Sequence, residues 1–301
     1  MLKAKPFIKW VGGKNQLLEQ LDNQLPAEFE NWDNATYIEP FVGGGAMLFY
    51  MLQRYPNIKQ AVINDINEDL ITCYQTVRDS SELLIKSLQE IEAQYISLQN
   101  EELRKEFFLT TRKRYNDKNL DPIDNTTLFF FLNKTCFNGL YRVNRKGGFN
   151  VPFGRYAHPT ICNAAIIRKD SELLQRVVIQ NGDFESTFNY ANGNTLFYFD
   201  PPYRPLNATS NFKDYAKEPF NDEEQVRLKT FCDKINDLGF KFLLSNSDSK
   251  DDNDNYFFET LYEKYQIARV WAKRSINSVG NKRGQLTEIV IRNYHSTKHN
   301  F

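Results

Sequence analysis

The sequence predicts an α/β fold in which a doubly wound mixed sheet carries an inserted helical and hairpin segment. Short apolar runs alternate with helical patterns near both ends of the chain, and this alternation stops in the middle. The 301 residues are enough for one large domain with an insertion, or for two modest domains.

Six short apolar runs are typical of strands that are covered on both faces. They lie at residues 37–39, 61–64, 177–180, 196–200, 240–245 and 289–292. A helical pattern at residues 47–53 follows the first run, and another at residues 223–238 precedes the fifth. Strands and helices in this order indicate a doubly wound sheet, which binds its ligands at the carboxyl ends of the strands.

The middle of the chain breaks this pattern. Residues 71–132 are helical, polar and poor in strands, and the turn signal Phe137-Asn138-Gly139 follows them. The aromatic and basic residues 140–156 then indicate a hairpin or a long loop. We therefore predict a discontinuous main domain, residues 1–75 and 159–301, and an inserted domain at residues 76–158.

Composition weighs against several classes of protein. The four cysteines are scattered and form no C-x-x-C pair, so we expect no zinc site and reduced thiols in the cytoplasm. His158 alone lies outside the C-terminal tail, which leaves multi-histidine metal sites and His-dependent nucleophiles poorly supported, and we expect no metal. No apolar stretch is as long as a transmembrane helix, so we expect no membrane association.

A glycine-rich turn is the first indication of a ligand site. Residues 37–46 form a strand, then Gly43-Gly44-Gly45, then the start of a helix, and glycines let the backbone approach a ligand closely. Alone, such a turn is as often a tight turn without a ligand. It lacks the G-x-G-x-x-G pattern, which argues against a dinucleotide site and an oxidoreductase.

Two further pieces strengthen the prediction of a nucleotide cofactor. Asp65 ends the second predicted strand, twenty positions after Gly45, where a ribose diol would be bound. Alone, Asp65 would fit a loop or a helix cap better. Near the N-terminus, Trp10 can pack on an adenine or a sulfonium, and Lys14 can pair with a carboxylate. A surface loop beside a core tryptophan fits that segment equally well.

The most specific motif is Asp200-Pro201-Pro202-Tyr203 at the end of an aromatic strand. An exocyclic amine is a poor nucleophile, because its lone pair is delocalised into the base. The Asp200 carboxylate and the Pro201 carbonyl can accept hydrogen bonds from its two N–H groups, and the prolines fix these acceptors in place. Tyr203 offers a ring on which an extruded base can stack.

Three motifs together resemble the Dam family of DNA adenine-N6 methyltransferases, and their order resembles its alpha arrangement. They are residues 9–14, 39–45 and 200–203, with smaller matches at residues 64–67, 182–184, 207–212 and 274–276. The resemblance implies the fold of S-adenosylmethionine (AdoMet)-dependent methyltransferases and in-line methyl transfer, without metal, to an adenine flipped between Asp200 and Tyr203. It implies AdoMet contacts at Trp10, Lys14, Asp65 and Asp200, with Asp183 near the cofactor adenine. The full set of expected cofactor residues is Trp10, Lys14, Glu39, Pro40, Phe41, Gly43, Asp65, Asp183, Phe184 and Asp200.

Double-stranded DNA is the expected partner. The formal net charge is zero, but residues 134–155 and residues 264–287 each contain several basic residues and no acid. Such stretches suit phosphate contacts, or a solvated face of the protein. Residues 137–142 and 149–154 are similar to the recognition hairpin of GATC-specific members, in which Leu140, Arg142 and Pro152 match positions that read the site. Tyr141 falls on a variable position, so we draw nothing from it. The expected DNA contacts are Lys134, Phe137, Asn138, Leu140, Arg142, Asn144, Pro152, Arg155 and Arg274.

Alternatives remain at this point. The same chemistry on cytosine N4 or an RNA base fits the motifs, although the resemblance favours adenine because Asp200 stands where N4 enzymes usually carry serine. A catalytically silent DNA-binding relative is a second alternative, against which the intact Asp65, Asp200 and Tyr203 argue. A cognate restriction endonuclease would be a genetic partner, and a neutral surface without a coiled-coil pattern fits a monomer.

Overall fold

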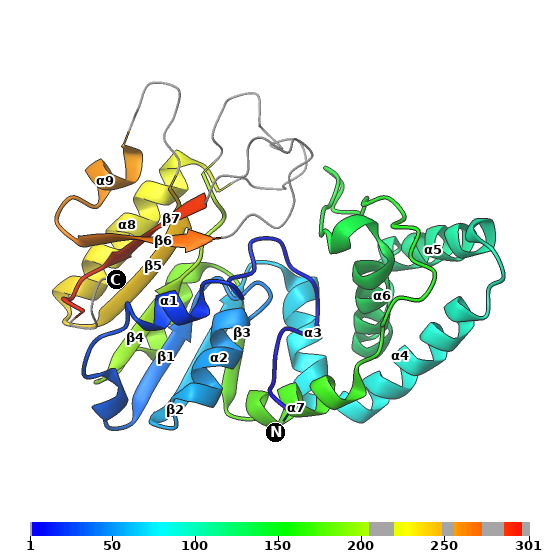
Figure 1. The fold of residues 1–301 in the computed structure, drawn as a ribbon, viewed down its shortest axis with the longest axis horizontal. Coiled ribbons are helices and arrows are strands. Elements are labelled where there is room, and N and C mark those ends of the chain that lie inside the picture. Colours follow the sequence, from blue (N-terminus) through cyan, green and yellow to red (C-terminus); the bar gives the residue numbers. More distant parts are fainter. Residues whose placement is uncertain (1, 205–219, 249–255, 273–285, 297–301) are drawn as a thin grey trace.

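The computed structural model describes residues 2–204, 220–248, 256–272 and 286–296. Their centre is a seven-stranded sheet in the order β3-β2-β1-β4-β5-β7-β6 (Figure 1). The strands are β1 (Ala35–Glu39), β2 (Ile58–Asp65), β3 (Val177–Asn181), β4 (Thr195–Phe199), β5 (Lys241–Ser247), β6 (Gln266–Ala272) and β7 (Leu286–Arg292). Strands β1 to β5 pair in parallel, and β7 runs antiparallel to both β5 and β6. This arrangement confirms the predicted mixed sheet of the AdoMet-dependent methyltransferase type.

Helices cover both faces of the sheet (Figure 1). The α-helices are α1 (Leu18–Asp22), α2 (Ala46–Arg54), α3 (Glu68–Asp79), α4 (Ser81–Ile96), α5 (Glu101–Asn116), α6 (Pro122–Thr135), α7 (Ala164–Leu174), α8 (Asp222–Asp237) and α9 (Phe257–Leu261). Three short 3-10 helices are η1 (Phe29–Asn31), η2 (Phe137–Gly139) and η3 (Phe184–Tyr190). No helix in these described ranges is both long and apolar enough to cross a membrane.

Alternating side chains of the central strands form two hydrophobic cores. In β1, Tyr37 packs with α2 and α3 on one face, while its neighbour Ile38 packs with α8 on the other. Such alternation explains why these strands appear as continuous apolar runs, since both faces are buried. The central strands therefore present mainly their ends to solvent and ligands.

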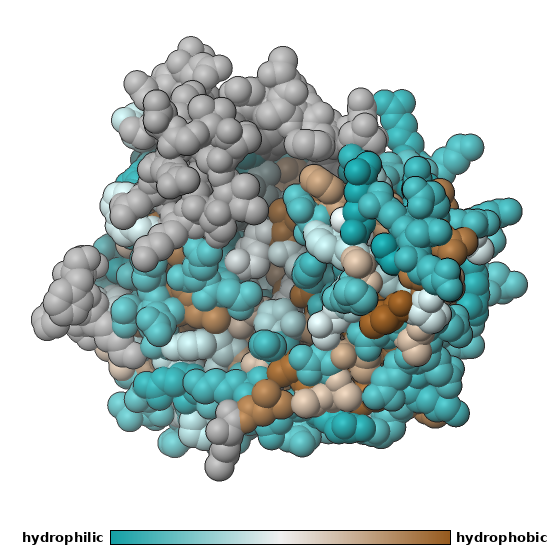
Figure 2. Space-filling view, turned by 45° about the vertical axis from the view of Figure 1, so that its right-hand side comes forward, coloured by the Kyte–Doolittle hydropathy of each residue, from teal (hydrophilic) through white to brown (hydrophobic). Residues whose placement is uncertain are grey.

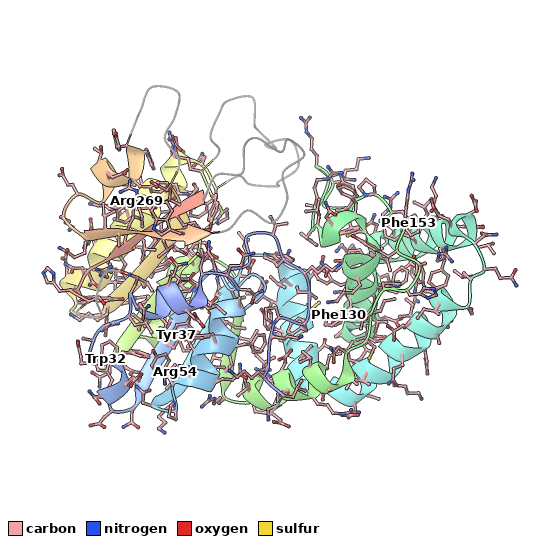
Figure 3. All side chains as sticks on the ribbon, in the orientation of Figure 1. Trp32, Tyr37, Arg54, Phe130, Phe153 and Arg269 are labelled. Carbon is pink, nitrogen blue, oxygen red and sulfur yellow. The ribbon has the colours of Figure 1, made fainter. Side chains whose placement is uncertain are left out.

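The inserted helices α4, α5 and α6 stand beside the sheet, on the right in Figure 1, and share its core. Phe130 of α6, labelled in Figure 3, stacks on Phe7 of the N-terminal segment with ring centroids 5.4 Å apart. Tyr37 of β1 belongs to the same hydrophobic cluster. The insertion is therefore packed against the sheet side through one continuous apolar layer.

Four details differ from the sequence-based expectation. The strand β6 was not expected, and Asp200 follows β4 directly instead of ending it. Residues 140–156 form a looped segment held by isolated bridges, Cys136 with Phe153 and Val143 with Phe149, so the long-loop alternative describes it better than a regular hairpin. The proposed division between residues 75 and 76 falls inside α3, which continues to Asp79.

Candidate active site

A cavity of about 1670 Å³ opens at the carboxyl ends of β1, β2 and β4. Figure 2 shows this side of the molecule, and a hollow in the middle of the view has hydrophilic side chains around it. Every residue expected to bind the cofactor or the target amine lines the cavity. These residues are Trp10, Lys14, Glu39, Pro40, Phe41, Gly43, Asp65, Asp183, Phe184, Asp200, Pro201, Pro202 and Tyr203. The sequence motifs, far apart in the chain, therefore meet in one space.

The glycine-rich turn connects the first two strands of the site. The Gly43 N–H donates to the Asp65 carboxylate over 3.1 Å, and the Tyr74 hydroxyl donates to the Gly43 carbonyl over 3.0 Å. Gly43 has a φ of +46°, and a Cβ built there would lie 2.9 Å from the indole of Trp10. Only glycine combines this left-handed backbone with so close an approach.

Asp65 is held from two sides. Its second carboxylate oxygen accepts a hydrogen bond from the Asn67 N–H over 3.0 Å, at the point where Asn67 caps α3. Burial raises the pKa of Asp65 above its usual value, while these backbone N–H groups oppose that shift. The carboxylate is therefore fixed at the tip of β2, facing the cavity that it lines.

An aromatic cluster forms the end of the cavity beyond Asp65. Phe41 packs on Phe184 with ring centroids 5.3 Å apart and on Phe220 at 5.5 Å. Asp183 begins η3 by accepting from the Glu185 N–H, and its carboxylate also pairs with Arg227 over 2.5 Å. Apolar rings next to a fixed carboxylate are suited to hold a planar base with polar edges.

The ammonium of Lys14 is the centre of the catalytic end. It lies 2.9 Å from a carboxylate oxygen of Asp200 and 2.9 Å from one of Glu288, and it also donates to the Tyr203 hydroxyl. The Lys14 side chain is only 3% exposed, so its charge depends on these partners. Ser245 of β5 lies 3.4 Å from the same oxygen of Asp200.

The protonation states follow from this arrangement. Burial raises the pKa of Asp200 to about 6, and the neighbouring Lys14 limits the rise. Burial alone would lower the pKa of Lys14, but Asp200, Tyr203 and Glu288 together raise it above its usual value. Asp200 is therefore ionised, and Lys14 charged, at neutral pH.

Glu39 is a buried carboxyl at the back of the cavity. It is 2% exposed and accepts a hydrogen bond from the Tyr37 hydroxyl over 2.9 Å. Burial raises its pKa well above the usual value, although the bond from Tyr37 opposes the shift.

Several of the expected DNA contacts lie in η2 and in the looped segment that follows it. Phe137 is 53% exposed, and its N–H donates to the carbonyl of the exposed Pro152 over 2.8 Å, which brings the two side by side. Arg142 donates to the side chain of Asn150 over 2.7 Å and to its carbonyl over 3.1 Å. The half-buried Leu140 lies between Phe137 and Arg142 in the chain.

The other expected contacts are distributed more widely. Lys134 and Asn138 line the cavity, and burial, with Lys9 and Lys5 nearby, lowers the pKa of Lys134 to about 8. The side-chain oxygen of Asn144 accepts from the N–H groups of Lys146 and Gly148, so it shapes the turn. Arg155 lies 3.5 Å from Glu101.

The second basic stretch is only partly described. Arg274 lies outside the described residues. Arg269 of β6, labelled in Figure 3 far from α4–α6, pairs with Asp248 and Glu259. Lys264 lies 3.0 Å from Asp233. The described cations of this stretch are therefore neutralised by acids of the main domain.

Sequence reasoning missed several groups of the site. Glu288 of β7, Ser245 of β5 and Tyr74 of α3 contact the catalytic or glycine-rich elements, and Phe220 completes the aromatic cluster. Glu288 stands directly before an apolar run that was expected to be a strand, and an acid at that place was the only available signal.

A glycine turn, an acid at the tip of β2 and an Asp-Pro-Pro-Tyr motif lie around one cavity, at the edge of the sheet where α/β enzymes bind their ligands. A family model described as D12 class N6 adenine-specific DNA methyltransferase matches residues 10–276. The chain belongs to this family, and it is an adenine-specific DNA methyltransferase.

Relatives support this family over nearly the whole chain. The chain is 47% identical to the Type II methyltransferase M.MjaIII of Methanocaldococcus jannaschii, over 97% of this chain and 100% of that protein. It is 36% identical to the Type II methyltransferase M1.LlaDCHI of Lactococcus lactis subsp. cremoris, over 97% and 96%. It is 30% identical to the DNA adenine methylase of Escherichia coli K12, over 96% and 95%.

Proposed function

We propose that the chain transfers a methyl group from AdoMet to N6 of an adenine flipped out of duplex DNA, within the site GATC. The observation that carries this proposal is the position of Asp200 and Tyr203. Both line the same cavity as the glycine-rich turn and Asp65, so a cofactor held by the turn and a base held by the motif would meet. In this proposal the domain that contains the sheet carries out catalysis, and the inserted domain, residues 76–158, recognises the target. If α3 is kept whole, the inserted domain begins at Ser80.

The residues present fit AdoMet. The fixed carboxylate of Asp65 suits a ribose diol, and the rings of Phe41 and Phe184 suit an adenine, with Asp183 at its edge. The indole of Trp10, pressed against the glycine-rich turn, suits the cationic centre. When bound, AdoMet supplies a methyl group already activated as a sulfonium, so no covalent enzyme intermediate is needed.

The motif residues would hold the target amino group. The Asp200 carboxylate and the Pro201 carbonyl each accept a hydrogen bond from one N–H of the adenine N6. These bonds localise the lone pair on the nitrogen, where it can attack the incoming methyl group. Tyr203 is 37% exposed, so its ring is accessible for stacking on the flipped base. As the N–C bond forms and the S–C bond breaks, one proton leaves N6, and Asp200 is placed to accept it.

The preference for GATC rests on the looped segment. Leu140, Arg142 and Pro152 match positions that read this site in the members that the chain resembles. Asn150 holds the Arg142 guanidinium in a defined orientation, and guanine O6 and N7 suit such a group. Phe137, exposed beside Pro152, would fill the gap left by the flipped base.

The biological setting is part of the proposal. Two relatives are named Type II methyltransferases, which supports a cognate restriction endonuclease as a genetic partner of this chain. We propose that the enzyme acts on DNA in the cytoplasm as a monomer, and a neutral sequence without a coiled-coil pattern supports the monomer.

The test uses methyl-labelled AdoMet and plasmid DNA, followed by digestion to nucleosides and identification of the labelled base. The same plasmid is then challenged with an endonuclease that is blocked by methylation at GATC. Labelled N6-methyladenine together with protected GATC sites is the expected result. N6-methyladenine without protection would reject the interpretation of Leu140, Arg142 and Pro152. A labelled cytosine would reject adenine N6 as the target.

A further inference from the structure

Tyr141 joins the looped recognition segment to the cofactor side of the cavity. Its ring stacks on the indole of Trp10, with ring centroids 5.4 Å apart and an angle of 24° between the planes. Phe129 of α6 and Phe149 of the looped segment pack on Tyr141 at 5.5 Å and 6.1 Å. Its neighbours in the chain are Leu140 and Arg142, which are proposed to read the site.

Trp10 lies between the Tyr141 ring and the glycine-rich turn. A Cβ built at Gly43 or at Gly44 would lie 2.9 Å from Trp10, so the indole is confined between the glycine-rich turn and the Tyr141 ring. A change in the position of Trp10 therefore displaces Tyr141 or the turn.

The Tyr141 hydroxyl makes a second connection. Burial raises the pKa of Tyr141, and the nearby side chains of Asn67 and Tyr115 oppose this rise, so the hydroxyl faces both of them. The Asn67 N–H donates to one oxygen of Asp65 over 3.0 Å, and the other oxygen accepts from Gly43 over 3.1 Å. A series of contacts thus runs from Tyr141 through Trp10 and Gly43 to Asp65 and Asn67.

We propose that Tyr141 is a positioning residue that couples occupation of the cofactor site to the arrangement of Leu140 and Arg142. A ligand that contacts Trp10 and Asp65 touches this series of contacts at two points, and Tyr141 is the member of the series that comes from the looped segment. Cofactor and target duplex then strengthen each other's binding by one common factor, as thermodynamic linkage requires. The inference rests on the proposed function, which supplies both ligands.

A purely structural role for Tyr141 makes a different prediction. If the ring only filled space, its loss would lower stability or weaken cofactor binding equally with and without DNA. The coupling factor, which is the ratio of the cofactor dissociation constants without and with duplex, would then stay unchanged. This ratio therefore separates coupling from packing.

The experiment compares the full-length wild type with Y141L, Y141F and the control F107L. Phe107 is also a partly buried aromatic of the insertion, and it packs on Tyr95 and Phe131 away from the cofactor residues. S-adenosylhomocysteine serves as the cofactor probe, because it allows no turnover. Its dissociation constant is measured with and without the duplex that the methylation assay identifies as substrate.

We expect a coupling factor of about 5–150 for the wild type and for F107L. In Y141L the factor falls to within about twofold of one. Y141F retains the ring and loses the hydroxyl that faces Asn67 and Tyr115, so its factor falls at least about threefold, and this keeps the test decisive if Y141L does not fold. Wild-type coupling in Y141L, or in Y141F when Y141L does not fold, would overturn the inference.

The two hypotheses fail in different ways. A wild type that binds both ligands without any coupling overturns the role of Tyr141 and leaves the proposed function intact. A folded wild type that binds neither S-adenosylhomocysteine nor duplex overturns the proposed function, and the inference with it.

Discussion

Replacing Lys14 with methionine removes the positive charge that lies 2.9 Å from the carboxylate of Asp200. An opposite charge at this range lowers a carboxyl pKa by roughly 1–3 units. The pKa of Asp200 is about 6 with Lys14 present. In K14M it therefore rises to roughly 7–9.

The sign of the effect on activity follows from the role of Asp200. The ionised carboxylate accepts a hydrogen bond from the target amino group. Methyl transfer by the wild type therefore falls as the pH falls through about 6, where Asp200 becomes protonated. In K14M the same loss occurs roughly 1–3 pH units higher. At pH 7.5 the wild type is almost fully ionised, whereas K14M retains roughly 3–75% of the ionised form.

The assay is the single-turnover rate of methyl transfer between pH 5.5 and pH 9, with AdoMet and duplex both saturating. Saturation removes effects on binding, and single turnover removes product release. K14R is the matched control, since it retains the charge, and circular dichroism checks the fold of both variants. An acid limb of K14M that coincides with that of the wild type would refute the link between Lys14 and Asp200.

Three further predictions concern the turn, the recognition segment and a buried acid. In G45A, a Cβ 2.5 Å from the Tyr74 hydroxyl and a φ of +72° should weaken AdoMet binding at least about tenfold by calorimetry, whereas G239A, equally left-handed but without a clash, should not. R142A should lose about 1–3 kcal/mol of binding and relax discrimination at one guanine; uniform weakening on all sequences would make Arg142 a phosphate contact. Asp170 is fully buried, one of its oxygens has no partner, and burial raises its pKa to about 8. Protonated Asp170 is therefore favoured in the folded state, and the stability that this contributes is lost as pH rises toward 8. From pH 4 to pH 8.5, the free energy of unfolding of D170N, measured with urea, should rise relative to that of the wild type by more than about 1 kcal/mol. Parallel pH profiles of the two proteins would contradict this.

The parts of the fold that sequence reasoning reached are those with continuous apolar runs. The strands β1 to β5 and β7 are buried or nearly so, and their runs are visible without a partner. Among the described residues, strand β6 pairs only with β7, and most of its side chains are half-buried or exposed, as Trp271 shows. An edge strand of this kind shows no apolar run, and basic residues around it suggested a DNA contact instead.

The site was predictable where a local motif carries the chemistry. The Asp200 motif and the glycine-rich turn have recognisable sequences, so their meeting in one cavity was expected. Glu288 and Tyr141 could not be found in this way. Glu288 reaches Lys14 only because β7 inserts antiparallel beside β5, and Tyr141 reaches Trp10 only through the packing of the insertion.

The place at which the chain leaves and re-enters the sheet has a consequence for how such an enzyme can change. Strand β2 ends at Asp65, and after the whole insertion β3 returns to pair beside it in parallel register. The entropy of closing a flexible loop grows only with the logarithm of its length, so doubling the length of a surface loop within the insertion would cost roughly 0.6 kcal/mol. A change in loop length therefore has little effect on the free energy of folding, and such changes could give new DNA specificities. The aromatic contact with Trp10 is a stronger constraint, because any replacement segment would have to form it again.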